Sequence, residues 1–205
     1  SLPEQLFYLE NLLGLVLREN ELGGEISNNI GMLSNLMYLD LSNNNFEGFI
    51  PNNIGLLTSL VNLSLSENQL TGTIPNSIGE LSYLSSLFLN NNFINGELPF
   101  ELGNCLELQY LQLYDNQITG EIPTSFCQLD LDWQSSYSFN ISNNFLCPPY
   151  PTCIENLNIG QNIINCEGVV SLWDSLYFVD DVFELDFSNF GSVSYTHLTL
   201  PTNTV

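Results

Sequence analysis

The residue types that most enzymes use for acid–base and nucleophilic catalysis are scarce in this sequence. His197 is the only histidine and lysine is absent, so no ordinary base is available to activate a nucleophile. Closely spaced carboxylates can hydrolyse glycosides, and two such pairs occur, Glu19 with Glu21 and Asp130 with Asp132. We interpret the first pair as solvated loop residues and the second as part of an insertion, because catalysis needs a shaped pocket. We therefore expect no enzymatic activity and no cofactor.

The charge balance of the chain excludes several kinds of partner. Its 205 residues include 23 acidic side chains and one basic side chain, Arg18, for a formal net charge of −22. Nucleic acids and anionic lipid surfaces are recognised through clusters of Lys and Arg, so we expect neither as a partner. The hydrophobic share of 44% suffices for a packed core. The lack of an 18-residue apolar run predicts no direct insertion into a membrane.

An internal repeat of 24 residues must position any functional side chains. Successive units begin at Leu12, Leu36, Leu60, Leu84 and Leu108. Three further residue types keep a constant phase within these units. Asparagine occurs at Asn20, Asn44, Asn68, Asn92, Asn116 and, in a sixth and degenerate unit, at Asn144. Glycine occurs at Gly24, Gly48, Gly72, Gly96 and Gly120, and proline at Pro51, Pro75, Pro99 and Pro123.

Each phase of the repeat has a physical reason. The Leu-x-Leu segment alternates apolar and polar residues, which predicts a short strand with one buried face. The phased asparagine follows the strand, where its amide can both donate to and accept from main-chain groups of its own and adjacent units. Such bonding is required of a buried amide, so we predict a ladder of asparagines. Glycine tolerates backbone shapes forbidden to other residues, and Ile-Pro predicts an extended step on the outer side.

The pattern L-x-x-L-x-L-x-x-N-x-L-x-G-x-I-P-x-x-I-G-x-L-x-x resembles the plant-type leucine-rich repeat. That repeat occurs in receptor-kinase ectodomains, in polygalacturonase-inhibiting proteins, and in bacterial and protist surface proteins. The resemblance implies an α/β repeat fold, namely a right-handed leucine-rich-repeat solenoid with a concave parallel β-sheet and an irregular or 3-10 convex side. It also implies a protein-binding module, without identifying the ligand.

The repeat pattern and its breaks predict how the chain is organised. A single unit buries too little apolar surface to fold alone, so neighbouring units must stack. We expect a solenoid at 1–158, which comprises a half repeat at 1–11, units starting at 12, 36, 60, 84 and 108, and a degenerate unit at about 136–158. A cysteine-containing cap or linker should follow at 159–181. The last two segments are the start of a further repeat at 182–192 and a tail at 193–205.

Both ends of the chain are expected to be incomplete. Residues 2–6 match the second half of a unit, so we expect the chain to begin inside a longer protein. From Val193 the sequence VSYTHLTLPT resembles the translation of a sequencing adapter, which implies that the tail is an assembly artefact. The alternative is a genuine edge strand, because these residues also alternate. His197 lies in this segment, so we expect the authentic chain to lack histidine.

The cysteines favour disulfides over a metal site. The chain has no C-x-x-C motif, and no histidine outside the tail could complete a zinc site. Cys127, Cys147, Cys153 and Cys166 are close in the sequence, and four cysteines allow three pairings. The expected stacking favours Cys127–Cys153 with Cys147–Cys166, while Cys105 falls on a convex phase as a small buried residue. Disulfides imply an oxidising compartment, hence an extracellular or cell-surface location.

The variable strand positions project from the predicted concave sheet and form the candidate ligand-binding surface. Phe88, Tyr110 and Tyr114 come from adjacent strands and should be diagonal neighbours. Exposed aromatic clusters anchor protein interfaces and also stack on sugars, although these rings could equally pack only on each other. The candidate contact residues are Tyr38, Asp40, Phe88, Asn90, Tyr110, Gln112 and Tyr114.

Two kinds of ligand suit this surface. A protein ligand with basic patches would be attracted by the acidic field. The alternative is a polysaccharide, or a purely structural role in a cell wall or surface.

Two tripeptides fit the N-glycosylation motif, Asn62-Leu-Ser and Asn140-Ile-Ser. Both asparagines fall at concave strand positions, where a bulky glycan would obstruct binding. In a chain rich in Asn and Ser we interpret both motifs as coincidental.

Overall fold

The computed structural model describes residues 1–163, 166, 169–172 and 175–178, and it divides the chain into two compact units, Ser1–Glu167 and Gly168–Val205. Of the second unit, the described part is an antiparallel pair of strands, β13 (Val169–Leu172) and β14 (Ser175–Phe178). This hairpin lies in the segment that the sequence predicted as a cap or linker. The predicted further repeat at 182–192 and the tail at 193–205 fall outside the described residues.

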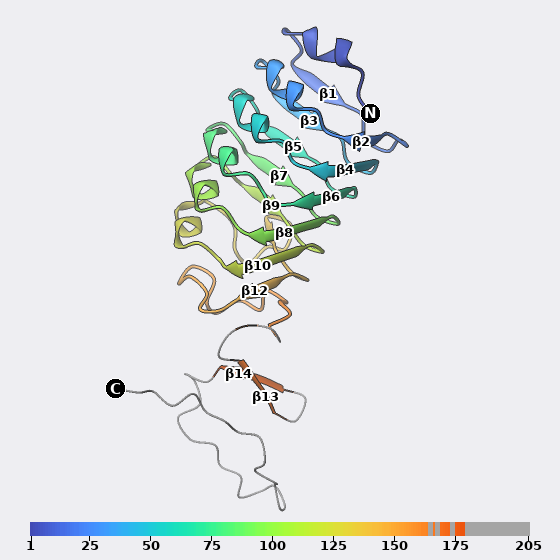
Figure 1. Ribbon diagram of the computed structural model, residues 1–205. Coiled ribbons are helices and arrows are strands. Elements are labelled where there is room, and N and C mark those ends of the chain that lie inside the picture. The colour runs from blue at the N-terminus through green and yellow to red at the C-terminus, as the bar shows by residue number, and fades with distance from the viewer. Residues whose placement is uncertain (164–165, 167–168, 173–174, 179–205) are drawn as a thin grey trace, which may run out of the picture. The chain divides into compact units, whose positions relative to one another are not determined.

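Within Ser1–Glu167, the Leu-x-Leu segments of successive repeats form the predicted parallel sheet (Figure 1). Neighbouring strands pair residues that are 24 apart in the sequence, as in Leu39 with Leu63. The last pair, Leu111 with Phe139, is separated by 28 residues because four residues are inserted between these two units. The strands are β1 (Gly14–Val16), β3 (Tyr38–Asp40), β5 (Asn62–Ser64), β7 (Ser86–Phe88), β9 (Tyr110–Gln112) and β11 (Phe139–Asn140).

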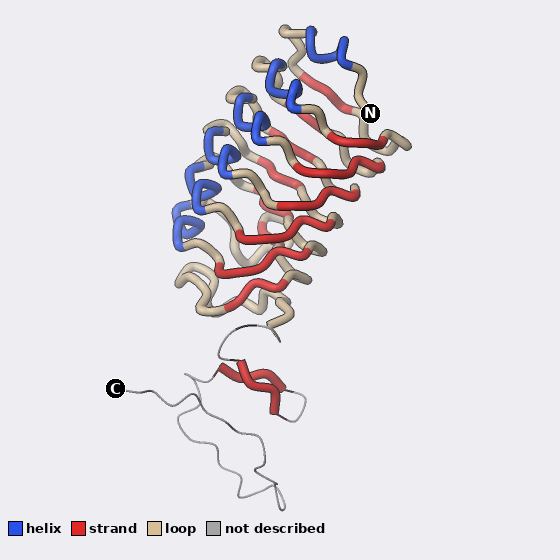
Figure 2. Tube along the Cα trace, viewed as in Figure 1, coloured by secondary structure: helices blue, strands red, loops and turns tan. Residues whose placement is uncertain are grey.

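Short 3-10 helices line another side of the stack (Figure 2). Five of the six follow a proline, whose φ between −72° and −59° suits entry into a helix. In the first full unit Ser27 replaces the proline, and its hydroxyl accepts from Asn29 N–H at 3.2 Å. The helices are η1 (Glu4–Tyr8), η2 (Asn28–Met32), η3 (Asn52–Leu56), η4 (Asn76–Glu80), η5 (Phe100–Asn104) and η6 (Thr124–Gln128).

A second parallel sheet runs along the stack, which the sequence did not predict. Its regular strands pair residues 22 apart, as in Glu47 with Gln69, so each repeat is shifted by two residues relative to the first sheet. The last pair, Thr119 with Phe145, is 26 apart because of the same four inserted residues. Each strand is too short for its alternation to stand out, and Gly48 adopts φ 77°, a shape that a strand pattern does not indicate. The strands are β2 (Gly23–Glu25), β4 (Asn45–Phe49), β6 (Gln69–Gly72), β8 (Phe93–Glu97), β10 (Gln117–Glu121) and β12 (Phe145–Cys147).

The core fills the space between the two sheets and the 3-10 helices. The first sheet contributes Leu39 and Leu63, the second sheet contributes Phe46 and the helices contribute Ile54, and all four side chains are fully buried. Each unit repeats this arrangement, so one continuous apolar column runs through the stack. Because every repeat covers the core of its neighbours, each repeat is stabilised mainly by contacts with the repeats next to it.

The phased asparagines form the predicted ladder. The Asn92 amide nitrogen donates to the Leu65 carbonyl of the preceding unit at 3.0 Å and to the Leu89 carbonyl of its own unit at 3.1 Å. Its amide oxygen accepts from Leu70 N–H of the preceding unit at 3.0 Å. The same pattern recurs at Asn44, Asn68, Asn116 and Asn144. One side chain therefore satisfies main-chain groups of two units at once.

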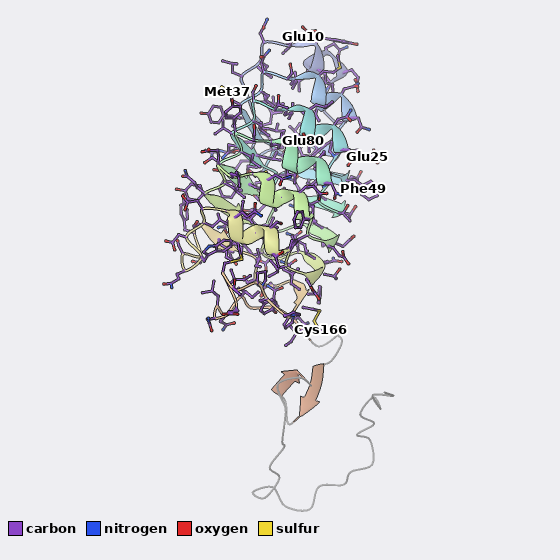
Figure 3. The ribbon with its side chains drawn as sticks, turned by 90° about the vertical axis from the view of Figure 1, so that its left-hand side faces the viewer. Glu10, Glu25, Met37, Phe49, Glu80 and Cys166 are labelled. Carbon is purple, nitrogen blue, oxygen red and sulfur yellow. A yellow bond between two sulfur atoms is a disulfide. The ribbon has the colours of Figure 1, made fainter. Side chains whose placement is uncertain are left out.

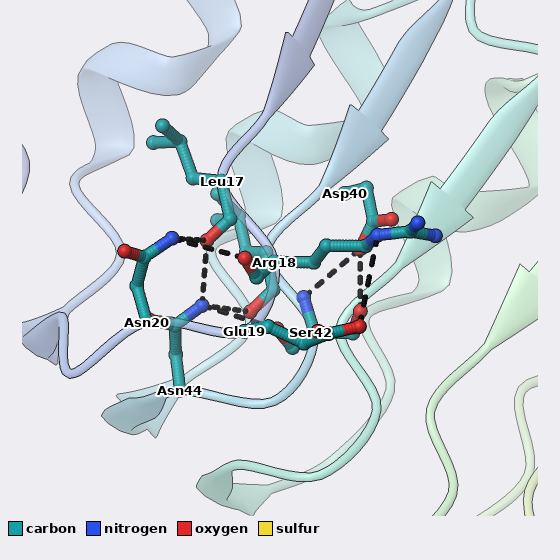
Figure 4. Close-up of polar contacts among 8 residues, drawn as sticks. Leu17, Arg18, Glu19, Asn20, Asp40, Ser42 and Asn44 are labelled. Atoms are coloured by element: carbon teal, nitrogen blue, oxygen red, sulfur yellow. Dashed lines mark hydrogen bonds and ion pairs between the residues drawn. The ribbon is translucent and has the colours of Figure 1, made fainter.

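The ladder begins and ends in different ways. Asn20 is exposed and its amide nitrogen donates to two carbonyls of its own unit, Leu17 at 3.1 Å and Arg18 at 2.9 Å (Figure 4). At the other end Gln161 takes the place of the next asparagine. Its amide donates to the Ile141 carbonyl at 2.7 Å and accepts from Leu146 N–H at 3.2 Å.

The residue before each ladder asparagine has a left-handed backbone. These residues have φ between 53° and 56°, a conformation that side chains other than Gly, Asn and Asp adopt at some cost. Three of the six are Asn and one is Asp, but Glu occurs twice. They are Glu19, Asn43, Glu67, Asn91, Asp115 and Asn143.

The two disulfides have the pairing that the sequence favoured. Cys127 of η6 bonds to Cys153 with an S–S distance of 2.05 Å, and Cys147 of β12 bonds to Cys166. Both bonds tie the last units to the segment that follows them. Cys105 is a free and fully buried thiol, and its sulfur donates to the Ile78 carbonyl at 3.3 Å.

We predict that Asn92→Leu lowers the free energy of unfolding by about 3 kcal/mol, because it leaves buried carbonyl and N–H groups of two units unpaired. Asn20→Leu is the matched control, since Asn20 is exposed and bonds to its own unit alone; its cost should stay below about 1 kcal/mol. Urea unfolding followed by circular dichroism measures both. Equal losses in the two variants would contradict the ladder's role.

Because of the Cys105 thiol, the free energy of unfolding should change with pH in the alkaline range. Burial raises the pKa of this thiol from an ordinary value of 9.0 to about 11. The folded state therefore holds the proton more tightly than the unfolded state, so the contribution is complete below pH 9 and is lost as the pH rises towards 11. We predict that the stability advantage of the natural chain over Cys105→Ala is constant from pH 6 to about 8 and shrinks above pH 9. A constant difference up to pH 11 would contradict this.

Candidate binding surface

The outer face of the first sheet presents two side chains from each strand, one on either side of a buried leucine. In β3, for example, Tyr38 is exposed, Leu39 is buried and Asp40 is half-buried. Parallel pairing in register aligns these positions into columns along the stack, so Tyr38 lies beside Asn62 and Asn62 lies beside Ser86. The repeat therefore holds a row of non-core side chains at a fixed spacing of about 4.8 Å per strand.

The aromatic candidates remain accessible to different degrees. Tyr38 exposes 49% of its surface, and Phe88, Tyr110 and Tyr114 are half-buried. Register pairs Phe88 with Gln112, so Phe88 and Tyr110 are diagonal neighbours. All four rings therefore keep accessible area on this surface.

Two candidate contact residues are corrected by their burial. Gln112 and Asn90 are each 7% exposed, so neither offers a side chain to a ligand. The Gln112 amide donates to the Tyr137 carbonyl at 2.7 Å and to the Ser136 carbonyl at 3.2 Å. Gln112 thus holds the segment between η6 and β11 against the sheet. The strand pattern alone does not reveal this, because an insertion that covers the sheet lies outside the repeat.

Asp40 has a structural partner of its own. Its carboxylate accepts from Ser42 N–H at 3.0 Å and from the Ser42 hydroxyl at 2.6 Å (Figure 4). These bonds shape the turn after β3, yet the carboxylate remains half-buried and keeps free acceptor positions.

The segment between η6 and β11 adds residues to the surface that the repeat pattern did not predict. The ring of Tyr137 meets that of Tyr110 edge-on, with centroids 5.4 Å apart, and exposes 75% of its surface. Trp133 packs edge-on against Phe139 at 4.9 Å, which anchors the insertion in the core. The four-residue break in the repeat was the available signal, because a break beside a binding face can place new side chains on that face.

The charges near this surface are mainly negative. Glu67 and Asp115 are exposed at the turns that follow β5 and β9. Arg18 lies 3.9 Å from Glu19, and both side chains are more than 60% exposed, so this ion pair contributes little. A ligand approaching the first sheet therefore meets acidic groups without a compensating basic cluster.

The carboxylate pairs considered for catalysis are exposed to solvent. Glu19, Glu21, Asp130 and Asp132 are all exposed. Within the described ranges no three His, Cys, Asp or Glu side chains gather as a metal site would require. No helix among those same residues has both the length and the apolar character of a membrane span.

A hollow in the surface lies away from the first sheet. It measures about 490 Å³ and is lined by residues that include Glu25, Phe49 and Thr73 of the second-sheet side. Figure 3 shows Glu25 and Phe49 on one side of the stack and Met37 on the opposite side. None of the predicted contact residues lines this hollow.

Comparison with known proteins identifies the repeat. A family model described as Leucine Rich Repeat matches residues 35–57, 59–81, 83–105 and 107–129. A chain in the structure of the BIR3–SERK2 complex from Arabidopsis thaliana is 34% identical with a TM-score of 0.55, and the match covers 68% of this chain and 72% of that one. The chain belongs to the leucine-rich-repeat family. No curated protein matches this leucine-rich-repeat chain.

Larger leucine-rich-repeat structures match only in part of their length. The Arabidopsis receptor kinase HAESA, solved with the peptide hormone IDA and the co-receptor SERK1, is 36% identical with a TM-score of 0.67. That match covers 71% of this chain and 24% of HAESA, so the chain spans about a quarter of the HAESA chain. The BIR2 ectodomain from Arabidopsis thaliana is 31% identical with a TM-score of 0.55, covering 67% of this chain and 71% of that one.

We predict that Gln112→Met loosens the insertion. The change removes both amide donors and leaves two carbonyls with weaker partners, which should cost about 1–2 kcal/mol and speed hydrogen exchange at residues 136–138. Gln117→Met is the control, because Gln117 is exposed on the second sheet. Exchange followed by mass spectrometry measures the effect. Unchanged exchange at 136–138 in Gln112→Met would show that other contacts hold the insertion.

Proposed function

We propose that this leucine-rich-repeat chain is a non-catalytic protein-binding module of an extracellular or cell-surface protein. The single observation that carries the proposal is the group of accessible aromatic side chains at the outer face of the first sheet, where Phe88 and Tyr110 are diagonal neighbours and the ring of Tyr137, just before β11, meets that of Tyr110. Tyr38 adds a further exposed ring three strands away in the same column. Clustered, partly exposed rings supply a large contact area at low conformational cost, as in the hot spots of protein interfaces.

The solved relatives support the same class of function. HAESA was solved with a peptide hormone and a co-receptor, and the BIR3–SERK2 structure is a complex of two proteins. We extend the general role, recognition of a peptide or protein, to this chain.

The chemistry of the surface suggests a basic ligand. Asp40, Glu67 and Asp115 border the aromatic row, and the whole chain has one basic side chain. An acidic field speeds the association of a basic partner and weakens as salt screens it. We therefore propose a peptide or protein segment that combines Lys or Arg with apolar side chains.

The proposed location follows from the cysteines. Two disulfides close the end of the stack, and such bonds persist in oxidising compartments. Passage through the secretory route would provide the conditions under which they form.

A displayed library of random peptides tests the proposed site. We expect the natural chain to enrich peptides rich in Lys and Arg, and their affinity to fall as salt rises. Phe88→Ala combined with Tyr110→Ala should weaken the selected peptides at least about tenfold, equivalent to 1.4 kcal/mol, with little change in the thermal midpoint. Phe100→Ala is the control, because Phe100 is 58% exposed on η5 rather than on the first sheet.

Two results would reject the proposal. Peptides that bind the double variant as tightly as the natural chain would place the site elsewhere. A positive glycan array without any peptide enrichment would favour the polysaccharide alternative instead.

A further inference from the structure

The two N-glycosylation motifs differ in their structural surroundings. Asn140 lies on β11, the last strand of the first sheet, whereas Asn62 lies on β5, the third strand of six. Asn62 is in register between Tyr38 and Ser86, within the proposed binding surface. A glycan on Asn62 would obstruct the middle of that surface, whereas one on Asn140, in register with Gln112 on the last strand, would cover only its end.

The Asn140 side chain is oriented by its own motif. Its amide oxygen accepts from Ser142 N–H at 3.1 Å and from the Ser142 hydroxyl at 2.7 Å. Both groups act as donors here, so the oxygen must face them and the amide nitrogen must point away. Every buried side-chain nitrogen and oxygen in the described residues has a hydrogen-bond partner. The Asn140 nitrogen takes part in none of the described hydrogen bonds and is therefore in contact with solvent.

The equivalent turn in another unit shows that the fold does not need this nitrogen. Asp40 forms the same pair of bonds with Ser42, at 3.0 and 2.6 Å, and a carboxylate has no nitrogen. The amide oxygen of Asn140 thus performs the structural role, and the nitrogen is free to carry a substituent.

The surface beside Asn140 provides room for a sugar. A hollow of about 370 Å³, lined in part by Asn140, Trp133, Ser136 and Asn158, opens next to the side chain. This volume lies at the low end of the roughly 300–1,000 Å³ of small-molecule sites. The aromatic side chain and the polar groups match the apolar face and the hydroxyls of a monosaccharide.

These surroundings replace the coincidental interpretation of this motif, and we propose that Asn140 carries an N-linked oligosaccharide whose first sugar occupies this hollow. The inference rests on the proposed extracellular role, because only chains that enter the secretory route undergo this modification. The donor is an oligosaccharide carried on a lipid pyrophosphate. The Asn140 nitrogen bonds to the anomeric carbon, the bond from that carbon to the phosphate oxygen breaks, the lipid pyrophosphate leaves, and one amide proton is lost.

The full chain, fused to a secretion signal and expressed in eukaryotic cells, tests this proposal. The secreted protein is treated with an amidase that releases N-glycans in heavy-oxygen water, which marks each modified asparagine for peptide mass spectrometry. We expect the mark at Asn140. Asn140→Asp should remove the glycan while keeping the turn, as Asp40 does, and Ser142→Thr should retain the glycan.

Several outcomes would overturn the inference. An unmarked Asn140 in the secreted natural chain would do so, and so would a mark at Asn62 alone. Glycosylation also slows the gel migration of chains translated in a cell-free system with microsomes, even when those chains are not secreted. If Asn140→Asp migrates like the natural chain in that assay, the inference is likewise rejected. The readout requires no ligand, so a glycosylated chain that binds no peptide would reject only the proposed function.

Discussion

The stack depends on the amide side chain that joins each unit to the one before it. Where the chain turns from the first sheet to the second, main-chain carbonyl and N–H groups are buried and find no partner in the hydrogen bonding of either sheet. Asn68 supplies the missing partners to Leu41, Leu65 and Phe46, which belong to two units. Burying these groups unpaired would cost several kcal/mol per unit. The need for this bond keeps the segment between strand and asparagine constant, while the chain elsewhere can vary in length.

That constraint explains where the irregular part of the structure occurs. The four extra residues after η6 lengthen the separation between partners, yet Asn144 still bonds to Leu113 and Ile118, as its counterparts do in regular units. Gln161 then ends the series with the same two kinds of bond. The insertion could therefore add new surface beside the sheet without disturbing the core, and the disulfides close the stack beyond it.

Core and binding surface are separated within each strand. Because leucines fill the core and asparagines satisfy the turns, the outward positions carry little of the stability and can differ from unit to unit. Aromatic side chains in this row face a field with almost no positive charge, which suits recognition of a basic segment. Asn140 borders the row, so a glycan there would limit how far a ligand extends towards the end of the stack.

The sequence alone determined the parallel sheet and the asparagine ladder, because each depends on residue types repeated at a fixed spacing. The 3-10 turns of the convex side were expected only from the resemblance to the leucine-rich repeat. It also favoured Cys127–Cys153, since stacking places equivalent positions side by side. Only the tertiary structure decided that Gln112 is buried, that Tyr137 joins Tyr110, and that Gln161 completes the ladder. These contacts involve segments outside the repeat, whose positions are set by packing against neighbouring units rather than by any periodic pattern.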